Sequence, residues 1–215
     1  MARTRPFDEN ADYYDNWYER HDFAYRSELA AVRVLLPEFE RAVEVGIGTG
    51  RFAEPFGIRF GVEPSAAMAE IARSRGIRVL IGAAEELPLE SSEFDLVTMM
   101  TTVAFLDDME RAFGEASRVL VPGGHILVAF LDAATKLGQG YVSRAAESPF
   151  YRDASFRSSN EVLECLSGAG FREPRSVQTI FEPPGTMSQI DCVLEGTGTG
   201  LFAVIRARRP VEKGE

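Results

Sequence analysis

The sequence contains few of the residues that hold proteins together covalently or through metal ions. Only two cysteines and two histidines occur among its 215 residues. Cys165 and Cys192 lack the spacing of a metal site, and so sparse a pair is typical of reduced thiols in the cytoplasm. We therefore expect a cytoplasmic protein that has neither a disulfide framework nor a bound metal.

Long hydrophobic runs are also missing from the chain. None approaches the roughly 20 apolar residues needed to cross a bilayer, and residues 1–6 lack the apolar core of a signal peptide. Positive charge is scarce as well: 23 basic residues stand against 33 acidic ones, which gives a net charge of −10. Because nucleic-acid binding needs a basic face, the composition disfavours both nucleic acid and membrane as partners.

The overall composition is that of an ordinary soluble domain. Hydrophobic residues make up 45% and charged residues 26% of the chain, which is long enough for one domain with a full core. Strand and helix signals alternate along it, which predicts a parallel sheet covered on both faces. Strands are predicted at residues 42–45, 58–62, 78–81, 94–100, 126–130, 177–181 and 201–205.

Capping residues mark the ends of the predicted helices. The first helix covers residues 27–36 and is stopped by Pro37. Three more begin at polar residues that can cap free backbone N–H groups: Ser65, Asp107 with Glu110, and Ser158 with Glu161. The last two predicted strands have no helix between them, so they must pair antiparallel.

Residues 42–52 hold the most specific pattern in the chain, an apolar run that leads into a turn with Gly46, Gly48 and Gly50. Glycines at alternate positions let the backbone turn tightly and approach a ligand without interference from Cβ atoms. The next predicted strand ends at Glu63, an acid placed to accept hydrogen bonds from ribose hydroxyls. The pattern therefore predicts a site for a nucleoside-containing cofactor.

One residue of this loop argues against a nicotinamide cofactor. The dinucleotide fingerprint G-x-G-x-x-G/A requires a small residue at position 51, where helix and strand close on each other, but this chain has Arg51. The third glycine, Gly50, also comes one residue early. An NAD(P)-dependent oxidoreductase of the Rossmann type is therefore the less favoured alternative.

With Glu44 ahead of it, the loop resembles the cofactor loop of class I S-adenosylmethionine (SAM) methyltransferases. Further segments carry the same resemblance in order: residues 61–65, 82–88, 94–97, 118–124 and 170–171. Together these motifs cover about two-thirds of the chain, which is a more specific signal than any single motif. They are similar to the ubiquinone/menaquinone-type small-molecule methyltransferases, which carry the methyltransferase type 11 domain.

The resemblance implies a Rossmann-like, three-layer α/β/α sandwich whose seven-stranded, mostly parallel sheet has an antiparallel last strand. It also implies an N-terminal helical lid or substrate segment at residues 1–36 and a methyltransferase domain at residues 37–215, which together form one compact domain. SAM is the implied cofactor. The residues expected to bind it are Glu44, Gly46, Gly48, Gly50, Glu63, Pro64, Ala84, Glu85, Thr101, Tyr14 and Trp17.

The chain departs from the family pattern at Ala83. The family often has an aspartate there, whose carboxylate accepts a hydrogen bond from the adenine amino group. Adenine recognition is therefore expected to rest on the backbone of Ala84 and Glu85, with the Glu85 side chain as a further candidate.

Methyl transfer from a sulfonium is an in-line displacement, so the protein mainly has to orient donor and acceptor and needs no covalent nucleophile. A base is required only for an acceptor that holds its proton at neutral pH. The candidates for a catalytic role are His21, Tyr18 and Thr101. The N-terminal aromatic residues either close over cofactor or substrate or only pack against the core, and the sequence leaves both readings open.

The acceptor is expected to be a small molecule, while the methylated atom (O, N, S or C) stays open. Residues 99–102 contain no Asn/Asp-Pro-Pro-Tyr/Phe motif, which disfavours methylation of adenine or glutamine amino groups. Neither cysteine lies where a cytosine-C5 methyltransferase places its nucleophile. We expect a monomer or homodimer. A non-catalytic SAM-binding protein is a further alternative, which would keep the glycine loop but lack a reachable acceptor pocket.

Overall fold

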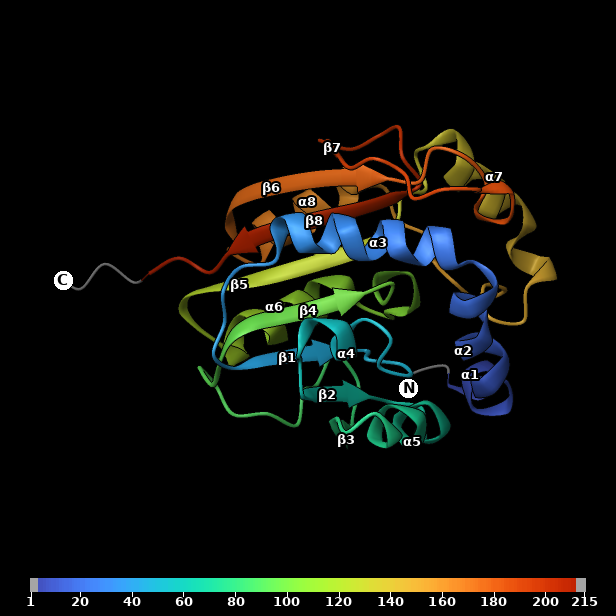
Figure 1. The fold of residues 1–215 in the computed structure, drawn as a ribbon. Helices are drawn as coiled ribbons and strands as arrows, with labels where there is room; N and C mark the ends of the chain where they lie inside the picture. The colour runs from blue at the N-terminus through green and yellow to red at the C-terminus, as the bar shows by residue number, and fades with distance from the viewer. Residues whose placement is uncertain (1–3, 212–215) are drawn as a thin grey trace.

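An eight-stranded sheet forms the centre of the computed structural model, which describes residues 4–211 (Figure 1). The strands lie in the order β3-β2-β1-β4-β5-β8-β6-β7. Their bounds are β1 Ala42–Val45, β2 Phe60–Glu63, β3 Arg78–Ile81, β4 Phe94–Met100, β5 Leu120–Leu131, β6 Arg172–Thr179, β7 Leu194–Glu195 and β8 Phe202–Arg208. Because β1 lies between β2 and β4, the strand order reverses at β1, and ligands of open α/β sheets bind at such a point, beyond the carboxyl ends of the strands.

Helices cover both faces of this sheet. Figure 1 shows α3 and α4 on the near face and α6 and α8 on the far face. The α-helices are α1 Arg5–Glu9, α2 Ala11–Arg20, α3 Asp22–Leu35, α4 Ala53–Phe56, α5 Ala66–Ser74, α6 Met109–Val119, α7 Lys136–Arg144 and α8 Ser159–Gly168. Short 3₁₀ turns lie at Val103–Phe105, Ala145–Glu147 and Pro184–Thr186.

The pairing of the strands confirms the predicted fold class. Strands β1 to β5 pair in parallel, and β8 pairs antiparallel with both β5 and β6. The sheet has eight strands rather than seven because β7 adds a short antiparallel edge to β6. That strand was missed because it is only two residues long and both are exposed, so it has no hydrophobic pattern to read.

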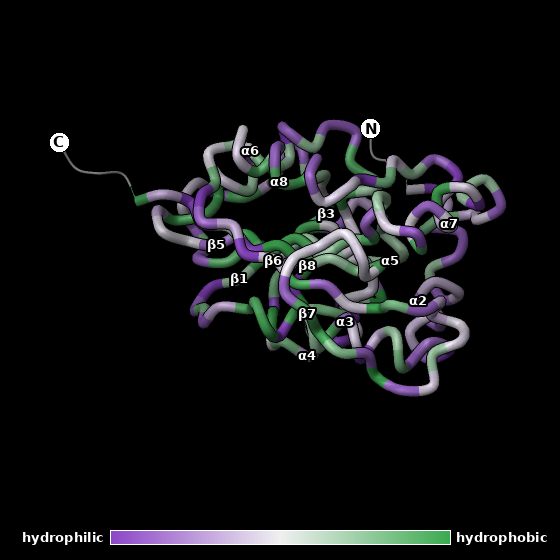
Figure 2. The backbone as a smooth tube through the Cα atoms, turned by 90° about the horizontal axis from the view of Figure 1, so that it is seen from above, coloured by the Kyte–Doolittle hydropathy of each residue, from purple (hydrophilic) through white to green (hydrophobic). Residues whose placement is uncertain are grey.

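The hydrophobic core consists of two layers, one on each face of the sheet. Successive side chains of a strand point to opposite faces; accordingly, Leu96 packs with the helices α3 and α5 while its neighbour Val97 packs with α6 and α8. Both side chains are fully buried. This explains why β4 is apolar apart from Asp95 and Thr98, and Figure 2 shows the hydrophobic residues concentrated in the central strands.

Two of the predicted helix starts are confirmed and two shift. The Ser65 side chain caps α5, and Ser158 with Glu161 forms the predicted capping box of α8. The helix predicted at residues 27–36 begins earlier, at Asp22, and no side chain caps its start, since its N-cap residue His21 makes no capping hydrogen bond. The N-cap of α6 is Asp108 rather than Asp107, and its carboxylate accepts a hydrogen bond from the Arg111 amide.

The bounds of four strands differ from the prediction, and one of these is β8, which covers Phe202–Arg208 rather than residues 201–205. Strand β5 starts at Leu120 rather than at residue 126, so the Pro-Gly-Gly sequence lies inside the strand, and a register shift in its pairing with β4 accommodates it. Strand β6 covers Arg172–Thr179 rather than residues 177–181, because its first half is polar and exposed. The strand predicted at residues 58–62 is β2, two residues shorter at its start and one longer at its end.

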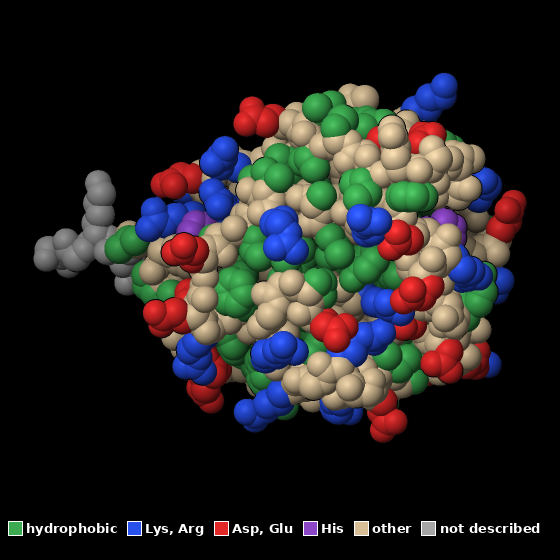
Figure 3. Space-filling model, viewed as in Figure 1, with side chains coloured by type: hydrophobic (Ala, Val, Ile, Leu, Met, Phe, Trp, Pro, Cys, Tyr) green, Lys and Arg blue, Asp and Glu red, His purple; other side chains and the backbone are tan. Residues whose placement is uncertain are grey.

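The N-terminal segment predicted to be helical contains α1, α2 and α3. Residues 1–3 of that segment, and residues 212–215 of the predicted methyltransferase domain, lie outside the described residues. No helix in the described part of the chain combines the length and the hydropathy of a membrane span. Acidic and basic side chains are interspersed on the face that carries α3 (Figure 3).

Candidate functional site

Three glycines shape the turn after β1, and each faces a different neighbour. Their φ angles are all positive: 68° at Gly46, 56° at Gly48 and 82° at Gly50. A Cβ atom on Gly46 would lie 2.4 Å from Thr102, and one on Gly50 would lie 2.7 Å from Ile77. A Cβ atom on Gly48 would meet a single side-chain atom, at 3.6 Å. The turn can therefore approach a ligand at Gly48, whereas Gly46 and Gly50 are needed for packing.

Glu63 ends β2 beside this turn, where the sequence places the ribose acid. One of its carboxylate oxygens accepts a hydrogen bond from the Gly48 amide at 2.8 Å, and the other accepts one from the Ser65 amide at 2.9 Å. Burial raises the pKa of Glu63 to about 7, although both hydrogen bonds lower it. Each oxygen keeps a second lone pair, so the carboxylate can still accept hydrogen bonds from a vicinal diol.

The turn and Glu63 border a narrow cavity of ≈ 90 Å³, the glycine-loop cavity. It lies at the carboxyl ends of β1, β2 and β4. Most of the residues expected to bind the cofactor line it: Gly46, Gly48, Glu63, Pro64, Ala84, Glu85, Thr101 and Tyr14. The carboxylate of Glu85 accepts hydrogen bonds from the Asp107 and Asp108 amides, so that side chain is already engaged within the protein.

The other expected residues lie elsewhere. Glu44 is buried in β1 behind the turn, where its carboxylate accepts a hydrogen bond from Thr98 Oγ1 at 3.4 Å. Burial raises the pKa of Glu44 to about 8. Gly50 lines no part of the cavity, and Trp17 lines a different one. His21 lines neither cavity, and its ring stacks on Trp17 with centroids 4.7 Å apart.

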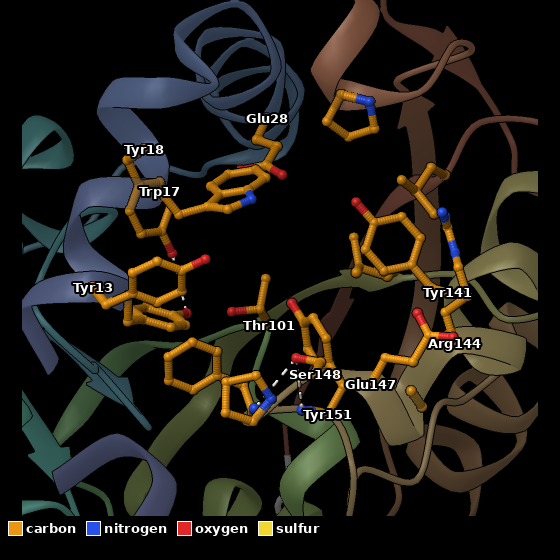
Figure 4. Close-up of a pocket in the computed structure, with 17 residues that line it drawn as sticks. Tyr13, Trp17, Tyr18, Glu28, Thr101, Tyr141, Arg144, Glu147, Ser148 and Tyr151 are labelled. Atoms are coloured by element: carbon orange, nitrogen blue, oxygen red, sulfur yellow. Dashed lines mark hydrogen bonds between the residues drawn. The ribbon is translucent and has the colours of Figure 1, made fainter. Parts of the chain in front are cut away.

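A second cavity of ≈ 440 Å³, the aromatic cavity, adjoins the first (Figure 4). Its volume is in the range of pockets that hold small molecules. Aromatic side chains from three segments form much of its wall: Tyr13, Tyr14, Trp17, Tyr18, Tyr141, Phe150 and Tyr151. The helix α7 was not predicted from the sequence; it contains two glycines, which have low helix propensity.

Thr101 and Tyr14 line both cavities and mark the place where they meet. Thr101 follows β4 with a φ of 55°, a conformation that is uncommon for a β-branched residue. The hydroxyl groups of Tyr14 and Tyr18 form a hydrogen bond of 3.2 Å. Burial raises the pKa of Tyr18 well above its usual value, so its hydroxyl stays protonated and is unsuited to act as a base.

The aromatic cavity also contains a buried acid, Glu28 of α3, which the sequence reading missed. Only 3% of this residue is exposed, and burial raises its pKa to about 8. A signal for it was present, because Glu28 follows Ala24 by four residues and precedes Val32 by four. It therefore lies on the buried, apolar face of its helix, which is an unusual place for a carboxylate.

Ion pairs fasten α2 to the glycine turn. Arg51, the residue that argues against a nicotinamide cofactor, contacts Asp15 of α2 at 2.6 Å. Arg75, at the end of α5, contacts the same carboxylate at 2.9 Å and donates a hydrogen bond to the Thr49 carbonyl. Burial alone would raise the pKa of Asp15, but hydrogen bonds from Arg51, Thr49 and Arg75 outweigh it and hold this pKa at about 2.

We expect the substitution Asp15→Asn to destabilise the protein by about 1–3 kcal/mol, because it removes the carboxylate that two partly buried guanidinium groups share and leaves them only their more exposed partners, Glu19 and Glu54. Thermal unfolding at pH 7 measures this loss. The matched control is Asp12→Asn on the same helix, where the side chain is exposed. Equal melting temperatures for the two variants would contradict the assignment of Asp15 as the anchor of α2.

Comparisons with known proteins agree with this geometry. Residues 43–128 match the model of a family described as methyltransferase domain. An uncharacterised protein of Methanocaldococcus jannaschii is 39% identical over 203 residues, which cover 94% of this chain and 98% of that relative.

Solved structures point the same way. A Thermotoga maritima SAM-dependent methyltransferase, described as a possible histamine N-methyltransferase, matches with a TM-score of 0.93 and 48% identity over 96% of this chain and 99% of that chain. A Haemonchus contortus phosphoethanolamine N-methyltransferase in complex with S-adenosylhomocysteine (SAH) matches with a TM-score of 0.62 and 17% identity, over 86% of this chain and 52% of that chain. The second likeness is one of fold alone.

Proposed function

The chain belongs to the SAM-dependent methyltransferases, and from this premise we propose that it methylates a small molecule held in the aromatic cavity. The observation that carries the proposal is the junction of the two cavities at Thr101 and Tyr14. A cofactor on one side of this junction can present its methyl group to an acceptor on the other side. A non-catalytic SAM-binding protein would have no need of such an adjoining cavity.

The residues of the glycine-loop cavity fit the nucleoside part of SAM. Gly48 leaves room for the backbone to approach a ligand, and Glu63 can accept hydrogen bonds from the ribose hydroxyls. Since Ala83 has no polar side chain and the Glu85 carboxylate is engaged, adenine recognition falls to backbone groups of Ala84 and Glu85. These roles are supported by the geometry and by the family to which the chain belongs.

SAM supplies a methyl group that its sulfonium charge already activates. The protein's contribution is therefore to hold the acceptor in line with that methyl group and to keep water out of the junction. Tyr14 and Thr101 lie where they can position both partners, whereas His21 lies outside both cavities. The volume and the aromatic wall of the second cavity support a small molecule as the acceptor, and the composition supports a cytoplasmic monomer or homodimer.

Calorimetric titration tests the cofactor part of the proposal. We expect SAM and SAH to bind with one site per chain, and NADH to give no heat of binding under the same conditions. The turn is unsuited to NADH because Arg51, paired with Asp15, occupies the position where a dinucleotide site needs a small residue. Binding of NADH in place of SAH would contradict the assignment of SAM as the cofactor. If SAM binds as expected, formation of SAH in the presence of candidate acceptors would establish turnover.

A further inference from the structure

The Glu28 carboxylate has no hydrogen-bonding partner in the part of the chain that the structure describes. It is buried at the wall of the aromatic cavity, and Figure 4 shows it extending from α3 toward the open space. Among residues 4–211 it forms neither a hydrogen bond nor an ion pair, and burial is the only cause of its raised pKa. A buried carboxyl group without a partner is costly for a folded protein, so this group is arranged to meet a ligand.

The groups that face Glu28 are aromatic rather than cationic. In its ionised form Glu28 raises the pKa of five tyrosines from the surrounding elements: Tyr14, Tyr18, Tyr25, Tyr141 and Tyr151. Burial raises the pKa of each of these phenols, so they remain neutral at physiological pH. Two further charged residues, Arg144 and Glu147, lie at the exposed rim of the cavity, and the Arg144 Nε atom donates a hydrogen bond to the Gly140 carbonyl.

A single buried carboxylate among neutral aromatic rings has a defined ligand preference. Aromatic faces attract organic cations, and a carboxylate forms a charge-assisted hydrogen bond with an ammonium group. An ammonium group bound at this place would stabilise the ionised form of Glu28, which burial otherwise disfavours. An acceptor that carries phosphate or carboxylate there would favour the protonated form and would gain no charge pairing.

We propose that the methyl acceptor is a small organic amine, and that Glu28 binds its ammonium group inside the aromatic cavity. The inference rests on the proposed function, because it assigns the aromatic cavity to the acceptor. It does so from Glu28, which lines the aromatic cavity and not the glycine-loop cavity. Cofactor binding and acceptor choice can therefore be tested separately.

The test uses the full chain saturated with SAH and titrates it by calorimetry with histamine, 2-phenylethylamine and tyramine. Each amine is paired with the alcohol in which a hydroxyl group replaces the amino group. We expect at least one amine to bind about tenfold or more tightly than its alcohol. If no amine of the three exceeds its alcohol, the proposal is wrong, while SAH binding in the same sample leaves the proposed function intact.

A pair of variants locates the preference. In Glu28→Gln the advantage of the amine over its alcohol is expected to fall by at least about tenfold, with SAH affinity unchanged. Glu164→Gln, the same substitution on the exposed surface of α8, is expected to keep the full preference. SAH binding also shows that Glu28→Gln is folded, and a Glu28→Gln variant that retained the amine preference would overturn the role of Glu28.

Discussion

Replacing Gly48 by valine is expected to abolish cofactor binding while the protein still folds. Gly48 lines the glycine-loop cavity, and the space beside its missing Cβ atom is open except for one side-chain atom at 3.6 Å. A valine side chain fits there in the empty protein but takes the place of the cofactor. We expect the affinity for SAH to fall at least about 100-fold, which corresponds to ~2.7 kcal/mol.

The same substitution also strains the backbone, because Gly48 has a φ of 56°. Gly57 provides the matched control: its φ is 74°, and a Cβ atom there meets nothing within 4 Å. Gly57→Val should therefore lose a similar amount of stability, of the order of 1–2 kcal/mol, and keep its affinity for SAH. If Gly48→Val bound SAH as the wild type does, the cofactor would not lie against this turn.

The parts of the site that could be predicted from the sequence are those that local backbone chemistry determines. Alternate glycines need positive φ angles, and an acid at the end of the following strand needs only a short separation along the chain. The caps at Ser65 and Ser158 are local in the same sense, since each bonds to an amide three residues later. Such features appear in the sequence as fixed spacings.

The acceptor side of the site could not be predicted in this way. Glu28, Tyr141 and Tyr151 come from separate segments, and the tertiary packing of α3 and α7 around one cavity brings them together. Likewise, the position of Arg51 in the loop was enough to argue against a nicotinamide cofactor, whereas its ion pair with Asp15 depends on how α2 packs against the turn. Glu44 shows the converse case: its motif position was clear, but its burial against Thr98 behind the turn was not.

The burial of Glu44 leads to the second large effect, which is a loss of stability at alkaline pH. The ordinary pKa of 4.5 applies to this carboxyl group in the unfolded chain, and burial raises its pKa to about 8 in the folded protein. Between these values the folded state holds the proton more tightly than the unfolded state does. The associated stability is complete below about pH 4.5 and is lost as the pH rises through about 8, up to roughly 5 kcal/mol at ~1.4 kcal/mol per pKa unit.

Chemical denaturation of the wild type and of Glu44→Gln at pH 5 and at pH 9 measures this effect. At pH 5 the variant should be less stable by about 1–3 kcal/mol, because its extra amide N–H groups are buried without an acceptor. At pH 9 the wild type carries a buried negative charge that the variant lacks. The difference in free energy of unfolding between wild type and variant should therefore shift by several kcal/mol in favour of the variant, relative to pH 5. Glu28 has a raised pKa of about 8 and acts in the same direction in both proteins, so it cancels from the difference. The exposed Glu164→Gln variant is the control, and its free energy of unfolding should follow that of the wild type at both pH values. If the unfolding free energies of Glu44→Gln and the wild type instead changed in parallel with pH, Glu44 would already be ionised in the folded protein.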